Sequence, residues 1–187
     1  LIRKMEAIIE KSFEIEEPID KVWANLSNPM EVASCVPGAA ITQQIDDTHY
    51  KGEVKLKFGP IKAQYDGDIE MVELDSSAYR MVMSGKGLDS KGKGSADMIM
   101  NGDLQSSDLG TNVNFKMTVT IVGTLAQFGS RLINDVSDQL LNQFIANFKA
   151  QLAGQEFDNN LSAGSMMVSV LKSKIGGIFK GKDESSS

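Results

Sequence analysis

A stretch with helical periodicity, residues 124–152, follows a series of strand-like segments in this 187-residue chain. Its apolar side chains recur at steps of three and four: Leu125, Phe128, Leu132, Val136, Leu140, Phe144, Phe148 and Leu152. This spacing predicts one amphipathic helix with a continuous apolar stripe, about 40 Å long at a rise of about 1.5 Å per residue. Such a helix can lie across a curved sheet and close a cavity. We therefore expect function to depend on what the cavity holds rather than on a catalytic constellation.

The segments that precede this helix alternate between apolar and polar side chains, as half-buried strands do. The alternation covers residues 6–16, 53–58, 61–70, 79–83, 96–100 and 113–121. Its phase slips near Met71, which predicts a β-bulge. Pro18 can begin a short helix, and Ser27-Asn28-Pro29 can end that helix and begin a second one over residues 29–34.

The predicted order of elements is β-α-α-β-β-β-β-β-β-α. Turns of hairpin length make neighbouring strands antiparallel. Charged residues at alternate strand positions indicate that one face of the sheet meets water. We predict an α+β fold, in which a curved antiparallel sheet of about seven strands wraps around a long C-terminal helix.

Composition limits the kinds of partner that the protein can bind and the cellular compartments in which it can reside. The net charge of −6 argues against nucleic acid as a partner of the body. Cys35 is the single cysteine, so an intrachain disulfide is impossible, which fits a reducing compartment. No apolar run approaches the ~18 residues of a membrane span, and early glutamates argue against a signal peptide. We expect Met5 to be the natural start, with Leu1 to Lys4 as a leader or tag remnant, and the protein to be cytoplasmic.

The sequence predicts neither a catalytic nor a metal site, and no covalent cofactor. His49 is the single histidine and follows Asp46-Asp47-Thr48, a turn composition, so we expect a surface histidine rather than a general base. Cys35 begins the turn Cys35-Val-Pro-Gly38. It is either a thiol at the cavity mouth or a small residue packed in a tight turn, and no neighbouring histidine or cysteine supports nucleophile or metal chemistry.

Methionine is frequent on the inward phase of the predicted strands. Core packing is one explanation, and the other is a lining that adapts to a flexible apolar ligand. The candidate cavity residues are Tyr65, Met71, Tyr79, Met81, Met83, Met98, Met100, Met117, Leu125, Phe128, Leu132 and Val136.

Two glycine–lysine segments, Gly85-Lys-Gly87 and Lys91-Gly-Lys-Gly94, resemble an anion cradle but lack the Ser or Thr of a P-loop. Two interpretations stay open. Either they form a glycine-rich hairpin with exposed lysines, or they lie at the cavity entrance and meet lipid phosphate or an acidic partner. The candidate mouth and partner residues are Cys35, Pro37, Gly38, Lys86, Lys91 and Lys93.

The composition changes after residue 152. We predict a ligand-binding domain over residues 5–152, a linker over 153–165 and an amphipathic basic tail over 166–187. The apolar and basic residues expected to meet a membrane are Met167, Leu171, Lys172, Lys174, Ile175, Ile178, Phe179 and Lys180. This composition is typical of a segment that lies in an anionic membrane surface. A helix docked on the body or on a partner is the alternative.

Several short motifs, in their order along residues 5–152, resemble one protein family. They are Pro18-Ile-Asp-Lys-Val-Trp23, Asn28-Pro29, Cys35-Val-Pro-Gly38, Phe58-Gly-Pro60, Gly85-Lys-Gly87, Gly92-Lys-Gly94 and Gly123-Thr-Leu-Ala-Gln-Phe-Gly-Ser-Arg-Leu-Ile133. The family is CoxG, named after the CoxG subunit of carbon monoxide dehydrogenase, within the START and Bet v 1-like (SRPBCC) superfamily. The first motif is generic to that superfamily, and the combination with the third and the last is more specific.

The resemblance implies a helix-grip fold and a non-enzymatic accessory role for a molybdenum hydroxylase. It implies recruitment of the enzyme to the inner face of the cell membrane, where the protein would be peripheral, and a quinone or lipid as the bound ligand. The substrate of the partner enzyme, carbon monoxide or another, stays open. A general lipid-transfer protein is an alternative function. A cyclase- or hydrolase-like enzyme of the same fold is another, but it would need acid–base groups in the cavity.

Overall fold

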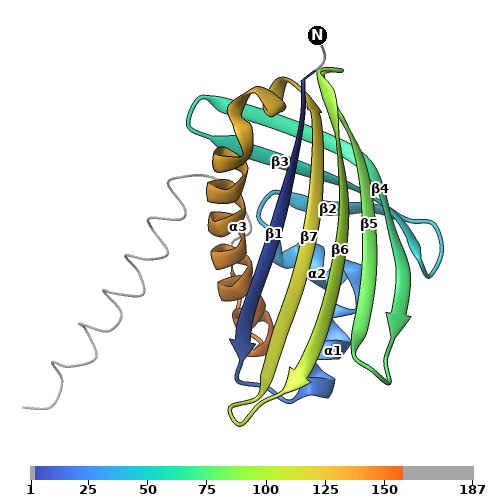
Figure 1. Cartoon of the computed structure of the whole chain (residues 1–187). Helices are drawn as coiled ribbons and strands as arrows, with labels where there is room; N and C mark the ends of the chain where they lie inside the picture. The colour runs from blue at the N-terminus through green and yellow to red at the C-terminus, as the bar shows by residue number, and fades with distance from the viewer. Residues whose placement is uncertain (1–2, 158–187) are drawn as a thin grey trace, which may run out of the picture.

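A computed structural model describes residues 3–157 of the chain (Figure 1). The predicted membrane-associating tail, residues 166–187, lies outside the described residues, as do residues 158–165 of the predicted linker. The elements are β1 (Lys4–Ile15), α1 (Ile19–Leu26), α2 (Pro29–Cys35), β2 (Ala39–Gln44), β3 (His49–Phe58), β4 (Ile61–Asp75), β5 (Arg80–Asp89), β6 (Gly94–Ser106), β7 (Thr111–Gly123), the 3-10 helix η1 (Thr124–Phe128) and α3 (Gly129–Leu152).

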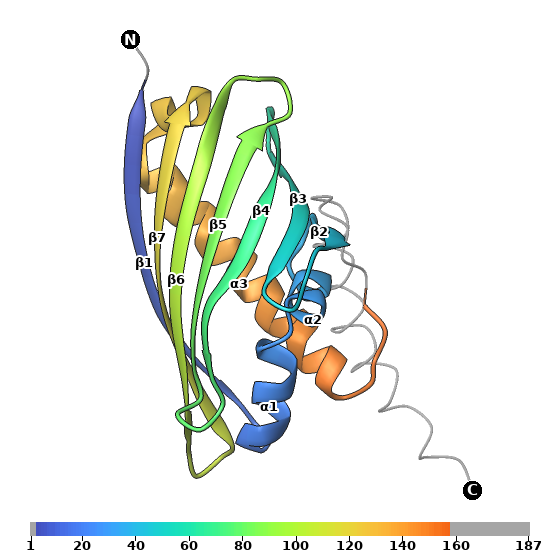
Figure 2. The same cartoon turned by 90° about the vertical axis from the view of Figure 1, so that its right-hand side faces the viewer.

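The seven strands form one sheet in the order β1-β7-β6-β5-β4-β3-β2, with antiparallel pairing throughout. The sheet curves around α3, and α1 and α2 lie at one end of the concave side (Figures 1 and 2). The predicted α+β helix-grip fold is therefore confirmed.

Two details of the strands show what alternation can and cannot locate. The predicted bulge is present, because the β4–β5 register shifts between Met71 and Glu73. Strand β2 is not marked by alternation, since four of its six residues are exposed and only Ala39 and Ile41 are partly covered. It lies at the edge of the sheet and pairs with β3 alone.

The predicted helix over residues 124–152 is interrupted near its start. Residues 124–128 form η1, and the α-helix begins only at Gly129. Gly123 and Gly129 have φ angles of 106° and 76°, a region that favours glycine. These two residues change the chain direction on either side of η1 and leave Phe128 40% exposed instead of within the continuous apolar stripe.

The apolar stripe of α3 serves two different environments. Towards its C-terminal end, Phe148 is fully buried, stacks on Phe144 at 5.6 Å between ring centroids, and belongs to the same core cluster as Leu152. The rest of the buried core is Ile15, Val22, Trp23, Cys35, Tyr50, Met71, Met81, Leu104 and Val113. Towards its N-terminal end, Leu132 and Leu140 face a hollow instead.

Helix α2 is fastened to α3 at the core end. The buried Asn147 side chain donates a hydrogen bond to the Cys35 carbonyl oxygen at 3.0 Å. The Cys35 thiol donates to Gln151 Oε1 at 2.7 Å, and the Ser34 hydroxyl donates to the same oxygen at 2.9 Å. These bonds satisfy buried polar groups and fix α2 beside the last turns of α3.

Candidate ligand cavity

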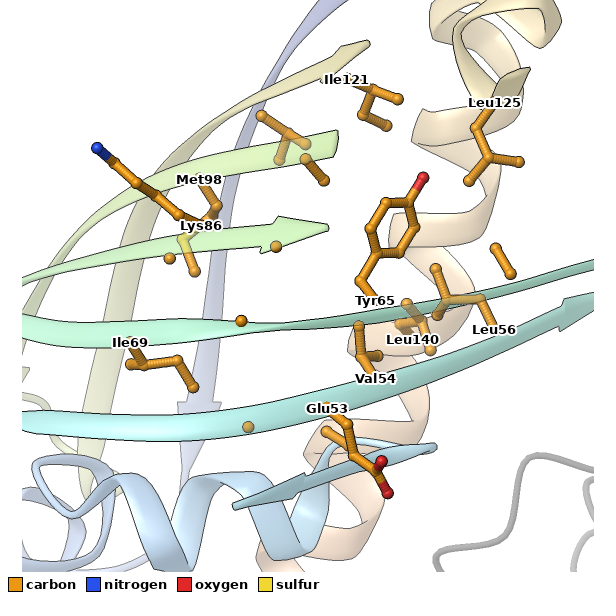
Figure 3. Close-up of a pocket in the computed structure, with 18 of the residues that line it drawn as sticks. Glu53, Val54, Leu56, Tyr65, Ile69, Lys86, Met98, Ile121, Leu125 and Leu140 are labelled. Atoms are coloured by element: carbon orange, nitrogen blue, oxygen red, sulfur yellow. The ribbon is translucent and has the colours of Figure 1, made fainter. Parts of the chain in front are cut away.

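A cavity of about 330 Å³ lies between the sheet and the N-terminal half of α3 (Figure 3). Ligand pockets in proteins range over about 300–1,000 Å³, so this one is large enough for a small ligand or part of a larger one. Its apolar side chains are Ala33, Ala39, Ala40, Ile41, Val54, Leu56, Ile61, Ala63, Ile69, Ala96, Met98, Val119, Ile121, Leu125, Leu132, Ile133, Val136 and Leu140.

A row of small residues forms the floor of the cavity. Gly52, Gly67, Gly87 and Ala96 are successive register partners across β3, β4, β5 and β6, and all four line the hollow. A Cβ on Gly67 would lie 1.9 Å from a main-chain carbonyl oxygen of β5, and a Cβ on Gly87 would lie 3.2 Å from Tyr65 Cβ. Side chains are excluded along this row, and their absence gives the cavity its depth.

Two hydroxyl side chains, Tyr65 and Ser137, line this apolar space, and the Ser137 hydroxyl donates to the Ile133 carbonyl oxygen at 2.7 Å within α3. The Tyr65 ring is buried, and Figure 3 shows its hydroxyl pointing between Ile121 and Leu125. Within residues 3–157 the Tyr65 hydroxyl has no hydrogen-bond partner. Burial, with a smaller contribution from the charge on Asp89, raises the pKa of Tyr65, so the side chain stays protonated and can donate a hydrogen bond.

Three charged residues beside the cavity form part of its wall with their main chain, and their charged side chains point away from it. Figure 3 shows the side chains of Glu53 and Lys86 pointing away from the hollow. Asp68 is turned to the outer face too, where it pairs with Lys51 at 3.1 Å. Lys86 was expected at the mouth, but it is opposite Asp68 and Asp97 in the registers of β5 with its neighbours, in the middle of the sheet.

The candidate cavity residues divide by their position along the strands. Those that line the cavity are Tyr65, Met98, Leu125, Leu132 and Val136. Those in or against the packed core are Met71, Tyr79, Met81, Met83 and Met100. Met117 is partly buried on β7 but does not line the cavity. The alternation identifies the inward face, whereas the cavity occupies only one end of that face.

A second hollow, here called the vestibule, continues the cavity to the surface. It measures about 750 Å³ and shares Leu56, Ile61, Ala63, Tyr65 and Leu125 with the cavity. The rest of its lining is Gly38, Lys55, Lys57, Pro60, Lys62, Gln64, Asp89, Ser90, Lys91, Lys93, Thr124 and Phe128. Of the predicted mouth residues, Gly38, Lys91 and Lys93 therefore border the opening.

Cys35 and Pro37 are buried and do not border the vestibule. The Cys35 thiol is fully covered against α3, and burial is the main reason that its pKa is raised. This placement corresponds to the packed-turn interpretation. His49 is exposed at the start of β3, directly after the β2–β3 turn, with Nδ1 3.0 Å from Asp46 Oδ1, so it is a surface histidine as expected.

Residues 3–157 contain neither a cluster of potential metal ligands nor a membrane-spanning helix. No group of three or more His, Cys, Asp or Glu side chains there could hold a metal ion. No helix in that part of the chain is long and apolar enough to cross a bilayer.

Comparison with known proteins identifies the family. The sequence model of the carbon monoxide dehydrogenase CoxG subunit matches residues 12–153, which include the whole cavity and vestibule. The chain belongs to the CoxG family. Membership associates it with carbon monoxide dehydrogenase and confirms the resemblance inferred from the motifs. No curated protein matches the chain.

Solved structures share the CoxG-family chain's fold at low sequence identity. A conserved protein from Geobacillus kaustophilus has a TM-score of 0.67 at 21% identity, over 82% of this chain and 96% of that one. An uncharacterized protein from Rhizobium leguminosarum has a TM-score of 0.58 at 13% identity, over 83% of this chain and 99% of that one. A protein from Chromobacterium violaceum has a TM-score of 0.53 at 17% identity, over 78% of this chain and 96% of that one. These likenesses show the fold alone.

Proposed function

We propose that this CoxG-family protein is a non-enzymatic carrier of an apolar ligand, a membrane quinone, for a molybdenum hydroxylase of the carbon monoxide dehydrogenase type. The supporting observation is an apolar cavity into which the Tyr65 hydroxyl projects as an unpaired donor, whereas the Ser137 hydroxyl of the described lining is already bonded within α3. A quinone combines an apolar ring, carbonyl acceptors and an isoprenoid chain. The Tyr65 hydroxyl can donate to a carbonyl while the surrounding aliphatic side chains cover the ring.

The size and continuity of the two hollows support a ligand with a ring and a tail. The cavity of about 330 Å³ suits the ring and the first part of the chain. The vestibule of about 750 Å³ gives the rest of the chain a path to the surface. Entry from this side places the tail in the opening and the redox-active ring beside Tyr65.

The electrostatics of the cavity favour a carrier over an enzyme. General acid–base catalysis uses side chains that exchange protons near the working pH. Among the described lining residues, Glu53 and Lys86 point away, and Asp68 pairs with Lys51 on the outer face. The group that points inward is Tyr65, whose raised pKa keeps it neutral. The cavity is therefore suited to holding a ligand without transforming it.

Membrane recruitment is part of the proposal and depends on residues 166–187. Their sequence combines an apolar helical face with lysines, and each lysine near an anionic surface contributes about 1 kcal/mol. Flotation with anionic vesicles tests this. Full-length protein should float at low salt, and a chain that ends at Gly164 should not. Equal flotation of both chains would show that the tail is not the anchor.

Binding of a short-chain quinone to the full-length protein, measured by isothermal titration calorimetry, tests the ligand. Tyr65→Phe should weaken binding roughly two- to tenfold, the effect of one neutral hydrogen bond. Tyr50→Phe is the matched control, because the Tyr50 hydroxyl donates to the Asp47 carbonyl outside the cavity. Unchanged affinity in Tyr65→Phe would contradict the proposed ring position.

A general lipid carrier is the second candidate function, because most of the described lining side chains are apolar. An alkyl compound of the same length without carbonyls distinguishes the two. A quinone carrier should bind it more weakly than the quinone and should show no difference between Tyr65→Phe and the unaltered protein for it. Equal affinities for both compounds favour the lipid carrier.

A further inference from the structure

Basic side chains gather at the end of the molecule where the cavity opens, although the whole chain has a net charge of −6. Lys55, Lys57, Lys62, Lys91 and Lys93 border the vestibule, and Asp89 is the one acidic residue in its described lining. A shallow neighbouring hollow brings Arg3 beside Lys93. In Figures 1 and 2 the N-terminal end of β1, the β5–β6 turn, η1 and the β3–β4 turn meet at this end.

Four of these lysines have no partner of opposite charge. Lys57, Lys62, Lys91 and Lys93 are exposed and form no ion pair with any residue in 3–157. Elsewhere on the body, Lys11 pairs with Asp138 at 2.6 Å and Lys21 pairs with Glu17 at 3.1 Å, whereas Lys116 and Lys149 are isolated lysines without an ion pair in residues 3–157. Unpaired cations around one opening create a positive potential there.

The opposite end of the molecule carries the opposite charge. The β1–α1 connection holds Glu16 and Glu17, α1 begins with Asp20 nearby, and the β4–β5 and β6–β7 turns contribute Asp75 and Asp108. Figure 1 shows these segments together at the end away from η1. Positive and negative charges are therefore separated along the direction of α3. A negatively charged surface attracts the end with the vestibule.

An exposed aromatic side chain accompanies the lysines. Phe128 in η1 is 40% exposed and lines the vestibule. Cations beside an exposed aromatic ring suit a surface with anionic groups above an apolar layer, which is the structure of an anionic lipid bilayer. A purely polar acidic surface would match the lysines but would give Phe128 no apolar contact.

We propose that the basic end, defined by Lys57, Lys62, Lys91, Lys93 and Phe128, docks directly on an anionic bilayer and turns the vestibule towards the lipid. This contact is separate from the proposed anchoring by residues 166–187 and does not depend on which ligand the cavity holds. An apolar ligand then passes between the bilayer and the cavity without crossing water.

The first test uses full-length protein and vesicles of phosphatidylcholine with or without phosphatidylglycerol, at low salt. The variant Lys57→Gln, Lys62→Gln, Lys91→Gln, Lys93→Gln should lose at least about tenfold in partitioning onto anionic vesicles, since one lysine near such a surface contributes about fivefold. The control is Lys21→Gln, Lys51→Gln, Lys116→Gln, Lys149→Gln. It makes the same change in net charge at exposed sites away from the basic end and should bind nearly as the unaltered protein does.

The second test measures orientation on the same vesicles. Phe128→Trp places a fluorophore at the basic end, and Leu109→Trp places one on the exposed β6–β7 turn at the acidic end. Brominated lipids should quench Phe128→Trp much more than Leu109→Trp. The native Trp23 is buried near the acidic end and serves as the common background.

The outcomes separate this inference from the proposed function. If both lysine variants partition alike, or if both tryptophans are quenched alike, the docking surface is wrong even where truncation after Gly164 abolishes flotation and so supports the tail. If the basic-end variant keeps its vesicle binding but no longer captures the dehydrogenase, the surface is a protein contact and the inference is overturned. Selective loss on anionic vesicles, with selective quenching of Phe128→Trp, supports it.

Discussion

Two leucines on the same helix should respond differently to the same substitution. Leu152 is buried in the core cluster, whereas Leu140 is partly exposed and faces the cavity. Leu140 lies in the interior of α3 and Leu152 is its last residue, but leucine and alanine are both strong helix formers, so helix propensity contributes little at either site. The difference between Leu140→Ala and Leu152→Ala therefore isolates the packing environment.

The expected magnitudes follow from burial. Removing a fully buried leucine side chain costs about 2–5 kcal/mol, because the transfer term and a new cavity both count. We expect about 3 kcal/mol for Leu152→Ala. At Leu140 the side chain already borders empty space, so only the transfer term remains. Three carbon groups at about 0.8 kcal/mol each, with about two-thirds or more of their surface buried, give about 1.5–2 kcal/mol.

Urea unfolding of ligand-free, full-length protein, followed by circular dichroism, measures both values. The expected difference is about 1 kcal/mol, which in a thermal scan of a chain of this size corresponds to roughly 2–4 °C in Tm. A bound ligand adds a second readout. It should stabilise Leu152→Ala as much as the unaltered protein, and Leu140→Ala less, because that variant loses a contact with the ligand.

Equal losses of stability in the two ligand-free variants would refute this reasoning. That result would mean that the N-terminal half of α3 packs on the sheet as tightly as the C-terminal half. A larger loss at Leu140 would carry the same meaning. The cavity of about 330 Å³ would then not exist in solution, and the carrier proposal would lose its basis.

Three further predictions concern the floor of the cavity and the β2–β3 turn. Ala96→Phe should fill the cavity and abolish quinone binding in calorimetry, whereas Ala146→Phe on the exposed face of α3 should leave it unchanged. Gly67→Ala should lower the free energy of unfolding by about 3 kcal/mol in urea titrations, because its Cβ would overlap a carbonyl oxygen of β5 and push the strands apart. In an NMR titration, the hydrogen bond to Asp46 should hold the pKa of His49 above 6.5, and Asp46→Asn should return it towards 6.5. The pKa of the Asp46 carboxyl should be about 2, chiefly because it accepts a hydrogen bond from the Thr48 main chain and, to a smaller extent, one from the His49 side chain. This pair stabilises the fold fully between pH 3.8 and pH 6.5, the ordinary pKa values of the two groups. The effect is lost as the pH rises through the pKa of folded His49 and as it falls from 3.8 through about 2, so Asp46→Asn should be most destabilising between pH 3.8 and pH 6.5.

The sequence predicts the fold well because the fold depends on local periodicity. Alternation identified the inward face of most strands, and the phase slip at Met71 predicted the bulge seen between Met71 and Glu73. The same periodicity does not tell how far along the strands a residue lies relative to the cavity and the core. It could not distinguish Met98, which lines the cavity, from Met81, which packs in the core.

The row of small residues was beyond sequence reasoning for a related reason. Gly52, Gly67 and Gly87 are far apart in the chain and align only through the β3–β4 and β4–β5 registers. Glycine inside an alternating strand is a signal that a backbone or a ligand approaches closely. Applied to Gly67, that signal indicates a close approach at this position. Without the strand register, the sequence could not show that Gly52 and Gly87 lie beside it and form the floor of the cavity.

The ends of the sheet decide how the cavity can change its size. The described sheet runs from β1 to β2, which are not joined to each other, so α3 covers an open seam. On one side Lys11 of β1 meets Asp138 of α3, and on the other the bonds of Asn147 and Gln151 fasten α2 to the last turns of the helix. Beside the vestibule, the Thr124 main chain donates to the Lys93 carbonyl oxygen at 3.1 Å, but among the described residues no side-chain bond or ion pair joins the β3–β4 turn to η1 or α3. The wall can therefore widen there without breaking a strand ladder, so a ligand bulkier than the empty cavity can be admitted at little enthalpic cost while the core end stays shut.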